Sequence, residues 1–275
     1  MNAPVNDTLD MVVRTHPGKV RANNEDAVFA DASRGLAILA DGMGGHNGGE
    51  VASGMLLTLL ATNFSEVLAC CDAKTLQSGG RPLVHEQIRT QIDLANRSIY
   101  NAALHQPQYA GMGTTLVLTW FYTNQLCVAH VGDSRLYRQR GSAFELLTHD
   151  HSVLQDQIDR GLVAAKDARH STIRNLLTRA LGVEPVVAIE FGDHEVLPGD
   201  VFLLCSDGLN DMLADEQIHQ ILLSHPEALN EAADELIEIA NNLGGRDNVS
   251  VILIKVRGAG AAPQRWWQKL LAWLK

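Results

Sequence analysis

Four aspartates stand at the ends of apolar runs or in turns between them, and they suggest the chemistry of this chain. They are Asp41, Asp133, Asp207 and Asp247. Two of the four share one layout, in which an apolar run leads to Asp41-Gly42 and again to Asp207-Gly208. A carboxylate at the end of a buried strand supplies oxygen to a hard cation, and glycine lets the backbone approach closely. A glycine-rich segment after a strand can also be a plain turn, but the repeated layout favours a cation site.

Glu25 and Asp26 extend this acidic set, and Arg21 precedes them in the same segment. If the strand ends converge, the carboxylates would raise one another's pKa, so a cation is needed to keep them ionised. Oxygen ligands without a Cys or His pair indicate Mg²⁺ or Mn²⁺ rather than Zn²⁺. Several carboxylates can hold two ions about 4 Å apart for phosphoryl displacement, with Arg21 orienting the phosphate through bidentate hydrogen bonds. The alternative for Arg21, Glu25 and Asp26 is a surface ion-pair cluster.

The hydrophobic spacing predicts the elements that must position these residues. Apolar residues at helical spacing from Glu50 onwards and over 84–99 predict two amphipathic helices, separated by an exposed loop over 72–82. Short apolar runs predict strands at 9–15, 27–30, 36–40, 116–122, 126–131, 135–140, 144–147, 201–205 and 249–256. Tight turns join the four runs between 116 and 147, which favours one antiparallel meander.

The remaining segments complete the expected order. Residues 149–185 are polar and predict short helices and loop, and two helices are expected after Gly208, the second from near Pro226 to Gly244. This alternation favours antiparallel sheets flanked by helices over a doubly wound parallel sheet.

Composition excludes some classes of function. A chain of 275 residues with 46% hydrophobic and 20% charged residues is ordinary for a globular protein. The formal net charge of -10 argues against nucleic-acid binding, which needs a basic face. The four cysteines have no zinc-like spacing and predict buried thiols in a reducing cytosol. The first ten residues lack the features of a signal peptide, and no stretch is long enough to span a bilayer.

Six motifs in this order and spacing resemble one family. They are VRANNEDAVF, LADGMGG, MGTT, VGDSR, CSDGL and GGRDNVSVI, within about residues 9–257. The chain resembles the metal-dependent protein phosphatases of the PPM family, the type 2C serine/threonine phosphatases, and in particular the compact bacterial members. The resemblance implies an α+β fold, a four-layer α-β-β-α sandwich in which two antiparallel sheets are flanked by helices. The metal centre would lie at one end of the sandwich.

The resemblance also implies which residues hold the metal. Asp41 would bridge two Mn²⁺ or Mg²⁺ ions, and the carbonyl of Gly42 would bind one of them. Asp207 and Asp247 would hold the other ion. Asp133, together with Asp207, would help to hold a weaker third ion.

Further roles follow from the same resemblance. Glu25 and Asp26 would hydrogen-bond metal-bound water, and Arg21 would bind the substrate phosphate. A hydroxide bridging the metals would attack phosphorus directly, without a phosphoenzyme. Met43 stands where animal members carry a histidine proposed to protonate the leaving serine oxygen. His46 is an alternative acid, but a metal-bound water is the better candidate, because a histidine near a helix start is more often a cap or a surface residue.

We therefore expect a protein phosphatase that acts on phosphoserine and phosphothreonine in proteins and opposes a Ser/Thr kinase. Residues from about 151 to 181 would form a flap beside the cleft. A hydrolase of small phosphomonoesters on the same site stays open, because only a flap shaped for peptide separates the two. A non-catalytic signalling scaffold of the same fold is less favoured, because every expected metal-binding aspartate is present.

The C-terminal segment is expected to lie outside a catalytic domain of residues 1–257. Residues 258–264 have the composition of a flexible linker, and 265–275 would form an amphipathic helix with a Trp-rich face and a basic face. This helix would suit an anionic membrane surface, a groove on a partner, or the phosphatase domain itself. The expected protein is a cytoplasmic monomer, with peripheral attachment to the inner face of the membrane as an option.

Overall fold

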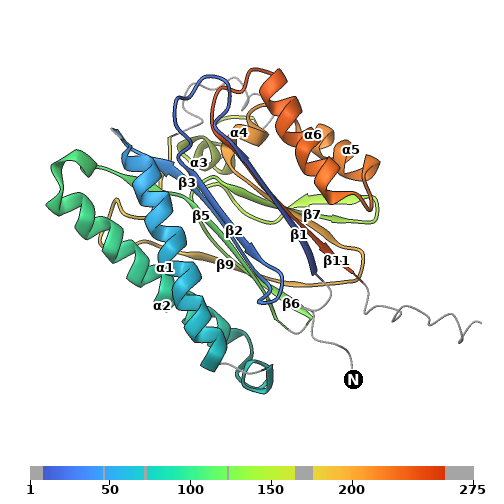
Figure 1. Cartoon of the computed structure of the whole chain (residues 1–275), viewed down its shortest axis with the longest axis horizontal. Coiled ribbons are helices and arrows are strands. Elements are labelled where there is room, and N and C mark those ends of the chain that lie inside the picture. Colours follow the sequence, from blue (N-terminus) through green and yellow to red (C-terminus); the bar gives the residue numbers. More distant parts are fainter. Residues whose placement is uncertain (1–8, 46, 71–72, 123, 165–175, 258–275) are drawn as a thin grey trace, which may run out of the picture.

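Two antiparallel sheets pack face to face between two layers of helices (Figure 1). The structure is a computed structural model that describes residues 9–45, 47–70, 73–122, 124–164 and 176–257, with the backbone alone over 65–66, 68–70 and 73–80. One sheet, the β1 sheet, has the order β1 (Leu9–His16), β11 (Val249–Val256), β10 (Val201–Cys205), β7 (Arg135–Arg140) and β8 (Ala143–Leu146). The other, the β2 sheet, has the order β2 (Asp26–Asp31), β3 (Leu36–Met43), β5 (Leu116–Tyr122), β6 (Gln125–Val131) and β9 (Glu190–Glu195), with short β4 (Gly113–Thr114) against β3. The expected four-layer sandwich is confirmed.

Each sheet has its own helical cover. The long helices α1 (Gly48–Cys70) and α2 (Ala73–His105) lie on the β2 sheet, and α4 (Asp207–Asn210), α5 (Asp215–Ser224) and α6 (Leu229–Asn242) lie on the β1 sheet (Figure 1). Helical spacing explains the packing, because Ile88, Ile92 and Ile99 of α2 are all fully buried on one face. Among the described residues, no helix combines the length and apolar character needed to cross a bilayer.

A third apolar cluster fills the space between the two sheets. It includes Leu39 and Phe121 from the β2 sheet and Phe202 and Ile252 from the β1 sheet, with the Phe121 and Phe202 rings edge to face and their centroids 5.4 Å apart. Strands such as β5 and β10 are therefore buried on both faces, which is why they read as continuous apolar runs. This shared core fixes the two sheets against each other, and with them the strand ends that carry the acids.

The expected four-strand meander is wrong, and the difference matters for the site. Strands β5 and β6 form a hairpin in the β2 sheet, whereas β7 and β8 form a hairpin in the β1 sheet. The turn Gly132-Asp133-Ser134 therefore passes from one sheet to the other. Gly132 has a φ of 105°, and a Cβ there would lie 2.6 Å from Thr115 Cγ2, so the crossing needs glycine.

The expected loop over 72–82 is also wrong, because α2 already begins at Ala73 and contains Pro82. The apolar stripe of α2 packs against α1 and the β2 sheet, and this packing outweighs the low helix propensity of the Gly and Pro residues. Within the polar stretch 149–185 the structure places α3 (Val153–Asp159) and irregular backbone on either side of residues 165–175, which are outside the described residues.

Candidate active site

The acidic residues singled out in the sequence meet at the end of the sandwich where strands of both sheets finish. Asp26 and Asp41 are opposite each other in the register of β2 and β3. Asp207 is the first residue of α4, directly after β10, and Asp247 precedes β11. Asp133 lies on the crossing turn between β6 and β7. The charges of Asp26, Asp133, Asp207 and Asp247 all act on the carboxyl group of Asp41, so the structure brings the whole set together.

Burial and mutual repulsion raise the pKa values of this cluster. The pKa values of Asp41 and Asp207 lie well above the ordinary range, first because of burial and then because of the neighbouring carboxylates. Burial raises the pKa of Asp26 to about 6 and that of Asp133 to about 7. The cluster therefore needs either protons or a cation at neutral pH.

Two carboxylate oxygens of the cluster lack the partner that a cation, or water bound to it, would supply. Asp26 Oδ1 and Asp207 Oδ1 are buried and have no hydrogen-bond partner within the described part of the chain. Buried polar atoms without partners are rare, and here they face a group of like charges that a metal ion would neutralise. The donor set is made of oxygen atoms, which suits Mg²⁺ or Mn²⁺.

The glycines of the two Asp-Gly pairs are required by close backbone packing. A Cβ on Gly42 would lie 2.1 Å from the carbonyl oxygen of Gly49, and one on Gly208 would lie 2.0 Å from that of Asn248. The amide of Gly42 also donates to the carbonyl of Glu25 at 3.1 Å. Glycine is therefore needed after Asp41 by the tight packing of β3 against the start of α1, and after Asp207 by the close approach of Asn248.

Two threonines from the MGTT motif hold the backbone of Asp41. Thr115 Oγ1 accepts from the Asp41 amide at 2.9 Å, and the Thr115 amide donates to the Asp41 carbonyl at 2.8 Å. Thr114 Oγ1 donates to the same carbonyl at 3.0 Å. These bonds fix the end of β3 and therefore the direction in which the Asp41 carboxylate leaves the strand.

Arg21 lies at the open side of the cluster. Its Nη2 donates to Asp247 Oδ2 at 2.7 Å, and this hydrogen bond raises the pKa of Arg21. The Arg21 side chain is 53% exposed, so much of the guanidinium remains accessible to a ligand. Glu25 lies against the first turn of α1, where Gly49 leaves room for its carboxyl group, and burial raises its pKa. The interpretation of Arg21, Glu25 and Asp26 as a mere surface cluster is not favoured, because all three border the buried aspartates.

Asn248 is a buried residue of the site that was not singled out in the sequence. Its Oδ1 accepts from the Glu25 amide at 2.8 Å, and its Nδ2 donates to the carbonyls of Pro17 and Asn23 at 3.0 and 2.9 Å. One amide side chain thus holds the segment that carries Arg21 and Glu25 against the start of β11.

Ser206 and Asp211 are further neighbours that the sequence reasoning missed. Ser206 Oγ donates to Asp26 Oδ2 at 2.8 Å and joins the β10 end to β2. Asp211 lies one helical turn after Asp207, and its charge raises the pKa values of Asp207 and Asp133. The signal for Asp211 was its spacing of four residues from Asp207 at the start of a helix.

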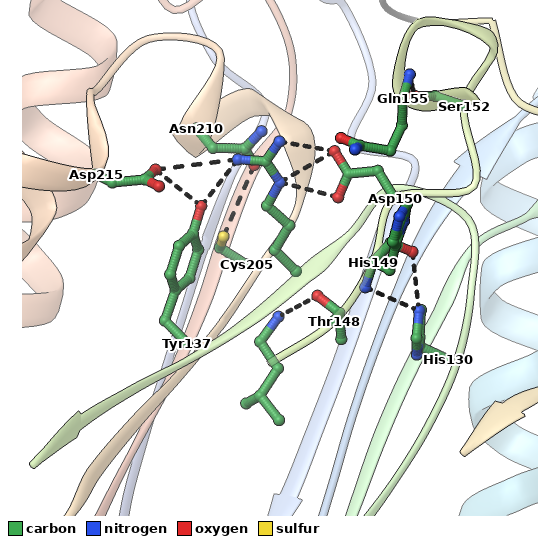
Figure 2. A network of polar contacts seen from close by, with 12 residues as sticks. His130, Tyr137, Thr148, His149, Asp150, Ser152, Gln155, Cys205, Asn210 and Asp215 are labelled. Atoms are coloured by element: carbon green, nitrogen blue, oxygen red, sulfur yellow. Dashed lines mark hydrogen bonds and ion pairs between the residues drawn. The ribbon is translucent and has the colours of Figure 1, made fainter. Parts of the chain in front are cut away.

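The turn that carries Asp133 is braced by a polar network (Figure 2). Arg135 donates from Nε and Nη2 to both carboxylate oxygens of Asp150, at 2.7–3.1 Å, and from Nη1 to the Tyr137 hydroxyl at 3.0 Å. Although burial alone would lower it, these hydrogen bonds raise the pKa of Arg135. The Tyr137 hydroxyl donates to Asp215 Oδ1 at 3.1 Å, so the network runs from the segment after β8 to α5.

The segment expected to act as a flap is joined to the site at both ends. At its beginning, the His151 amide donates to the Gly132 carbonyl at 2.9 Å, next to Asp133. At its end, Leu181 and Thr114 exchange backbone hydrogen bonds of 2.9 and 3.0 Å, next to Gly42. His46 and the segment 258–275 lie outside the described residues.

A cavity of about 490 Å³ opens beside the end of β3. It begins at Met43, the residue after Gly42, and continues along 177–188, where Val183 and Val186 are exposed. Arg179 and Glu184 add charge to its wall. The cavity therefore adjoins the end of β3 that carries Asp41 and Gly42, and most of its lining is apolar.

Buried carboxylates joined from two antiparallel sheets, with an accessible arginine beside them, define a metal-dependent enzyme of phosphoryl chemistry. Residues 18–248 match the family model described as protein phosphatase 2C, so the chain belongs to that family. It is a serine/threonine protein phosphatase of the bacterial, metal-dependent type.

Two known proteins illustrate the relationship. The chain is 36% identical over 245 residues to the serine/threonine phosphatase stp of Listeria welshimeri, which covers 88% of this chain and 94% of the relative. It superposes with a TM-score of 0.81 on the crystal structure of the Mycobacterium tuberculosis serine/threonine phosphatase PstP/Ppp, at 36% identity and covering 91% and 99% of the two chains. A structure of the PstP catalytic domain in complex with two manganese ions has a TM-score of 0.79, with the same identity and coverage.

Proposed function

We propose that this protein removes phosphate from phosphoserine and phosphothreonine in proteins by means of two Mn²⁺ or Mg²⁺ ions held by Asp41, the Gly42 carbonyl, Asp207 and Asp247. The observation that carries the proposal is the set of buried carboxylates with unpartnered oxygens beside an accessible Arg21. The two manganese ions in the PstP complex support the same number of ions here.

Some residues of the chain would bind the metal ions and the phosphate, and others would orient the attacking water. Bound metal ions would supply an activated water and would neutralise charge on the phosphoryl oxygens. Arg21 would hold the phosphate through its exposed N–H groups. Asp26 Oδ1 would accept a hydrogen bond from the attacking water and orient it, and Glu25 would do the same from the α1 side. Met43 cannot donate a proton to the leaving oxygen, and a metal-bound water would be a better candidate for this role than His46.

The test is hydrolysis of phosphoserine and phosphothreonine peptides with and without added Mn²⁺. We expect turnover that depends on the metal, and Asp207→Asn should remove nearly all of it because one ion loses a charged ligand. Asp234→Asn is the matched control, because Asp234 is an exposed aspartate of α6 that pairs with Arg14. Full turnover in excess chelator would contradict the metal mechanism.

A small-molecule phosphomonoesterase is the second candidate. The apolar cavity beside Met43 favours a peptide, because a small phosphate ester would leave that surface unused. Retention of the whole acidic set argues against a non-catalytic scaffold. We further propose that a Ser/Thr kinase supplies the phosphorylated protein and that Asp133 with Asp207 binds a weaker third ion.

The segment 265–275 is proposed to attach a catalytic domain of residues 1–257 to an anionic membrane surface, with residues 258–264 as linker and 151–181 as flap. The support is its sequence: on a helix, the Trp and Leu residues would lie on one face and the basic residues on the opposite face. Co-sedimentation with anionic vesicles should be strong for the full chain and negligible for a chain that ends at Gly260. Equal binding by both chains would remove the membrane role, and a lower melting temperature after truncation would indicate packing on the domain instead.

A further inference from the structure

A second group of metal-ligating side chains lies outside the active site, between α2 and the β2 sheet. Cys127 of β6 and Asp193 of β9 are directly opposed in the antiparallel register, so their side chains lie on the same face of the sheet. His85 of α2 approaches them, and its Nε2 lies 2.9 Å from Asp193 Oδ2. One donor atom of each residue lies within 4.8 Å of the other two. Helix and sheet thus place a thiol, an imidazole and a carboxylate together.

This group is buried, and several of its polar atoms lack partners. Cys127 has no exposed surface, and the side chain of Asp193 is only 12% exposed. Asp193 Oδ1 and the Tyr122 hydroxyl are buried without a hydrogen bond to any described residue, and His85 Nε2 has only its contact with Asp193 Oδ2. Burial, followed by the charges of Asp193 and Cys127, raises the pKa of Tyr122 to about 12, so its hydroxyl belongs to the same group. Buried polar atoms without partners are rare in folded proteins and need an explanation.

We propose that His85, Cys127 and Asp193 form a zinc site, with a water molecule as the fourth ligand. Sulfur and imidazole nitrogen are the donors that Zn²⁺ prefers, whereas the catalytic cluster offers oxygen only. With bonds of about 2.0–2.3 Å, donor atoms around tetrahedral zinc lie roughly 3.5 Å apart. Donors that already lie within 4.8 Å of one another need to move by about 1 Å.

The chemistry of the three ligands is consistent with this assignment. Burial raises the pKa of the Cys127 thiol, so the thiol is protonated in the absence of metal, and zinc binding releases that proton to solvent as the Zn–S bond forms. The His85 ring stacks on Phe191 at a centroid distance of 4.5 Å, which fixes its orientation toward the sheet. Arg81 is the competing cation, with its Nε 3.9 Å from Asp193 Oδ2, but its side chain is 63% exposed and free to turn to solvent.

The position suggests that the site is structural. His85 follows Pro82, which cannot donate a backbone hydrogen bond within α2. A zinc ion would fasten this turn of the helix to β6 and β9. The simpler account is an ion pair of His85 with Asp193 beside an inert thiol, and the two accounts differ in whether the thiol binds metal.

The test uses the full chain with Cys70 and Cys71 replaced by Ser, because the structure does not describe their side chains. After chelator treatment the protein is titrated with Co²⁺, which absorbs strongly in the near ultraviolet when a thiolate binds it and does not when only oxygen binds it. We expect one thiolate-bound Co²⁺ per chain, displaced by Zn²⁺. Cys127→Ser should abolish the band, whereas Cys205→Ser, a change at an equally buried cysteine of β10, should keep it.

His85→Gln provides a variant that should fold, because the His85 side chain is 29% exposed. We expect it to weaken Co²⁺ binding at the thiolate site by about tenfold or more and to abolish the rise in melting temperature on Zn²⁺ addition, with Mn²⁺-dependent phosphatase turnover unchanged. Absence of a charge-transfer band with the parent chain, or a band that survives Cys127→Ser or is unaffected by His85→Gln, would overturn the zinc site.

Discussion

At the scale of single residues, the types and spacing of the acids were sufficient to predict the cluster that the fold brings together, because the acids stand beside strands and glycine follows where backbones touch. Their roles as metal ligands stay a prediction. The supporting residues could not be found in this way. Asn248 acts through Pro17, Asn23 and Glu25, which are more than two hundred residues away in sequence, and an asparagine beside a strand has many ordinary uses. Only the folded chain shows that Asn248 joins both ends of the molecule beside the acidic cluster.

Asn248→Ala should therefore lower both stability and substrate affinity. The change removes the hydrogen-bond partner of the Glu25 amide and of the Pro17 and Asn23 carbonyls, which are partly buried, and should reduce the free energy of unfolding by about 1–3 kcal/mol. It should also raise KM for a phosphopeptide, because the segment that carries Arg21 loses its anchor. Urea unfolding and steady-state kinetics measure the two effects. Asn242→Ala is the control, because Asn242 is exposed and its side chain accepts a hydrogen bond from Lys19 at the surface. Equal effects of both changes would contradict the role of Asn248.

Asp133→Ala should lower turnover by roughly 10–100-fold while two metal ions remain tightly bound. The reason is the place of Asp133 on the turn between the sheets, apart from the Asp-Gly pairs. Calorimetric titration with Mn²⁺ counts the ions that remain. Loss of all tight metal binding would show that Asp133 belongs to the inner pair.

At the scale of elements, the strand bounds could be predicted where the local spacing of apolar residues indicates burial. They could not be predicted where pairing with a strand distant in sequence decides the structure. The bounds of β5, β10 and β11 were predicted from apolar runs and those of β7 from the turns on either side of it, and all are confirmed. Strand β9, with the sequence EFGDHE, has too little apolar character to be recognised and forms because β6 offers it a ladder. The wrong meander has the same cause, because a tight turn does not reveal which sheet the next strand joins.

The cavity formed by β3 and residues 177–188 gives an element-scale prediction about peptide recognition. Val186→Ser should raise KM for phosphopeptides with apolar residues near the phosphate about threefold to tenfold, because a lost methylene-sized contact is worth about 1 kcal/mol. Turnover of p-nitrophenyl phosphate should not change. Leu104→Ser, at a similarly exposed position of α2, is the control. An equal loss with both substrates would favour the small-molecule phosphomonoesterase.

At the scale of the whole molecule, the carboxylate cluster makes the stability of the metal-free fold depend on pH. The pKa values of about 6 for Asp26 and about 7 for Asp133 exceed the unfolded value of about 3.9, so the metal-free folded state binds more protons between pH 4 and 7. Folded pKa values that are raised give stability that is present below pH 4 and is lost as pH rises through 6–7.

The metal-free protein should therefore resist urea less well at pH 8 than at pH 5, and Mn²⁺ should restore the loss at pH 8. His130 and His151, whose pKa values burial lowers, act in the opposite sense at acidic pH. Asp26→Asn isolates the carboxylate, because it should remove up to about 3 kcal/mol of this pH dependence. The same pH dependence in parent and variant would contradict the assignment to Asp26.

The pairing of β1 with β11 also has a consequence for biosynthesis. The first described strand, from Leu9, lies against the last, which ends at Val256, so β1 leaves the ribosome long before its partner exists. Such long-range pairing makes folding slow, because the chain loses the entropy of closing a very large loop before the contacts between the two strands can form. Asp247 arrives together with β11, and with it the last ligand of the proposed metal pair. If Asp247 is a ligand as proposed, the metal pair can be completed only when the final strand has been made and closes the sheet.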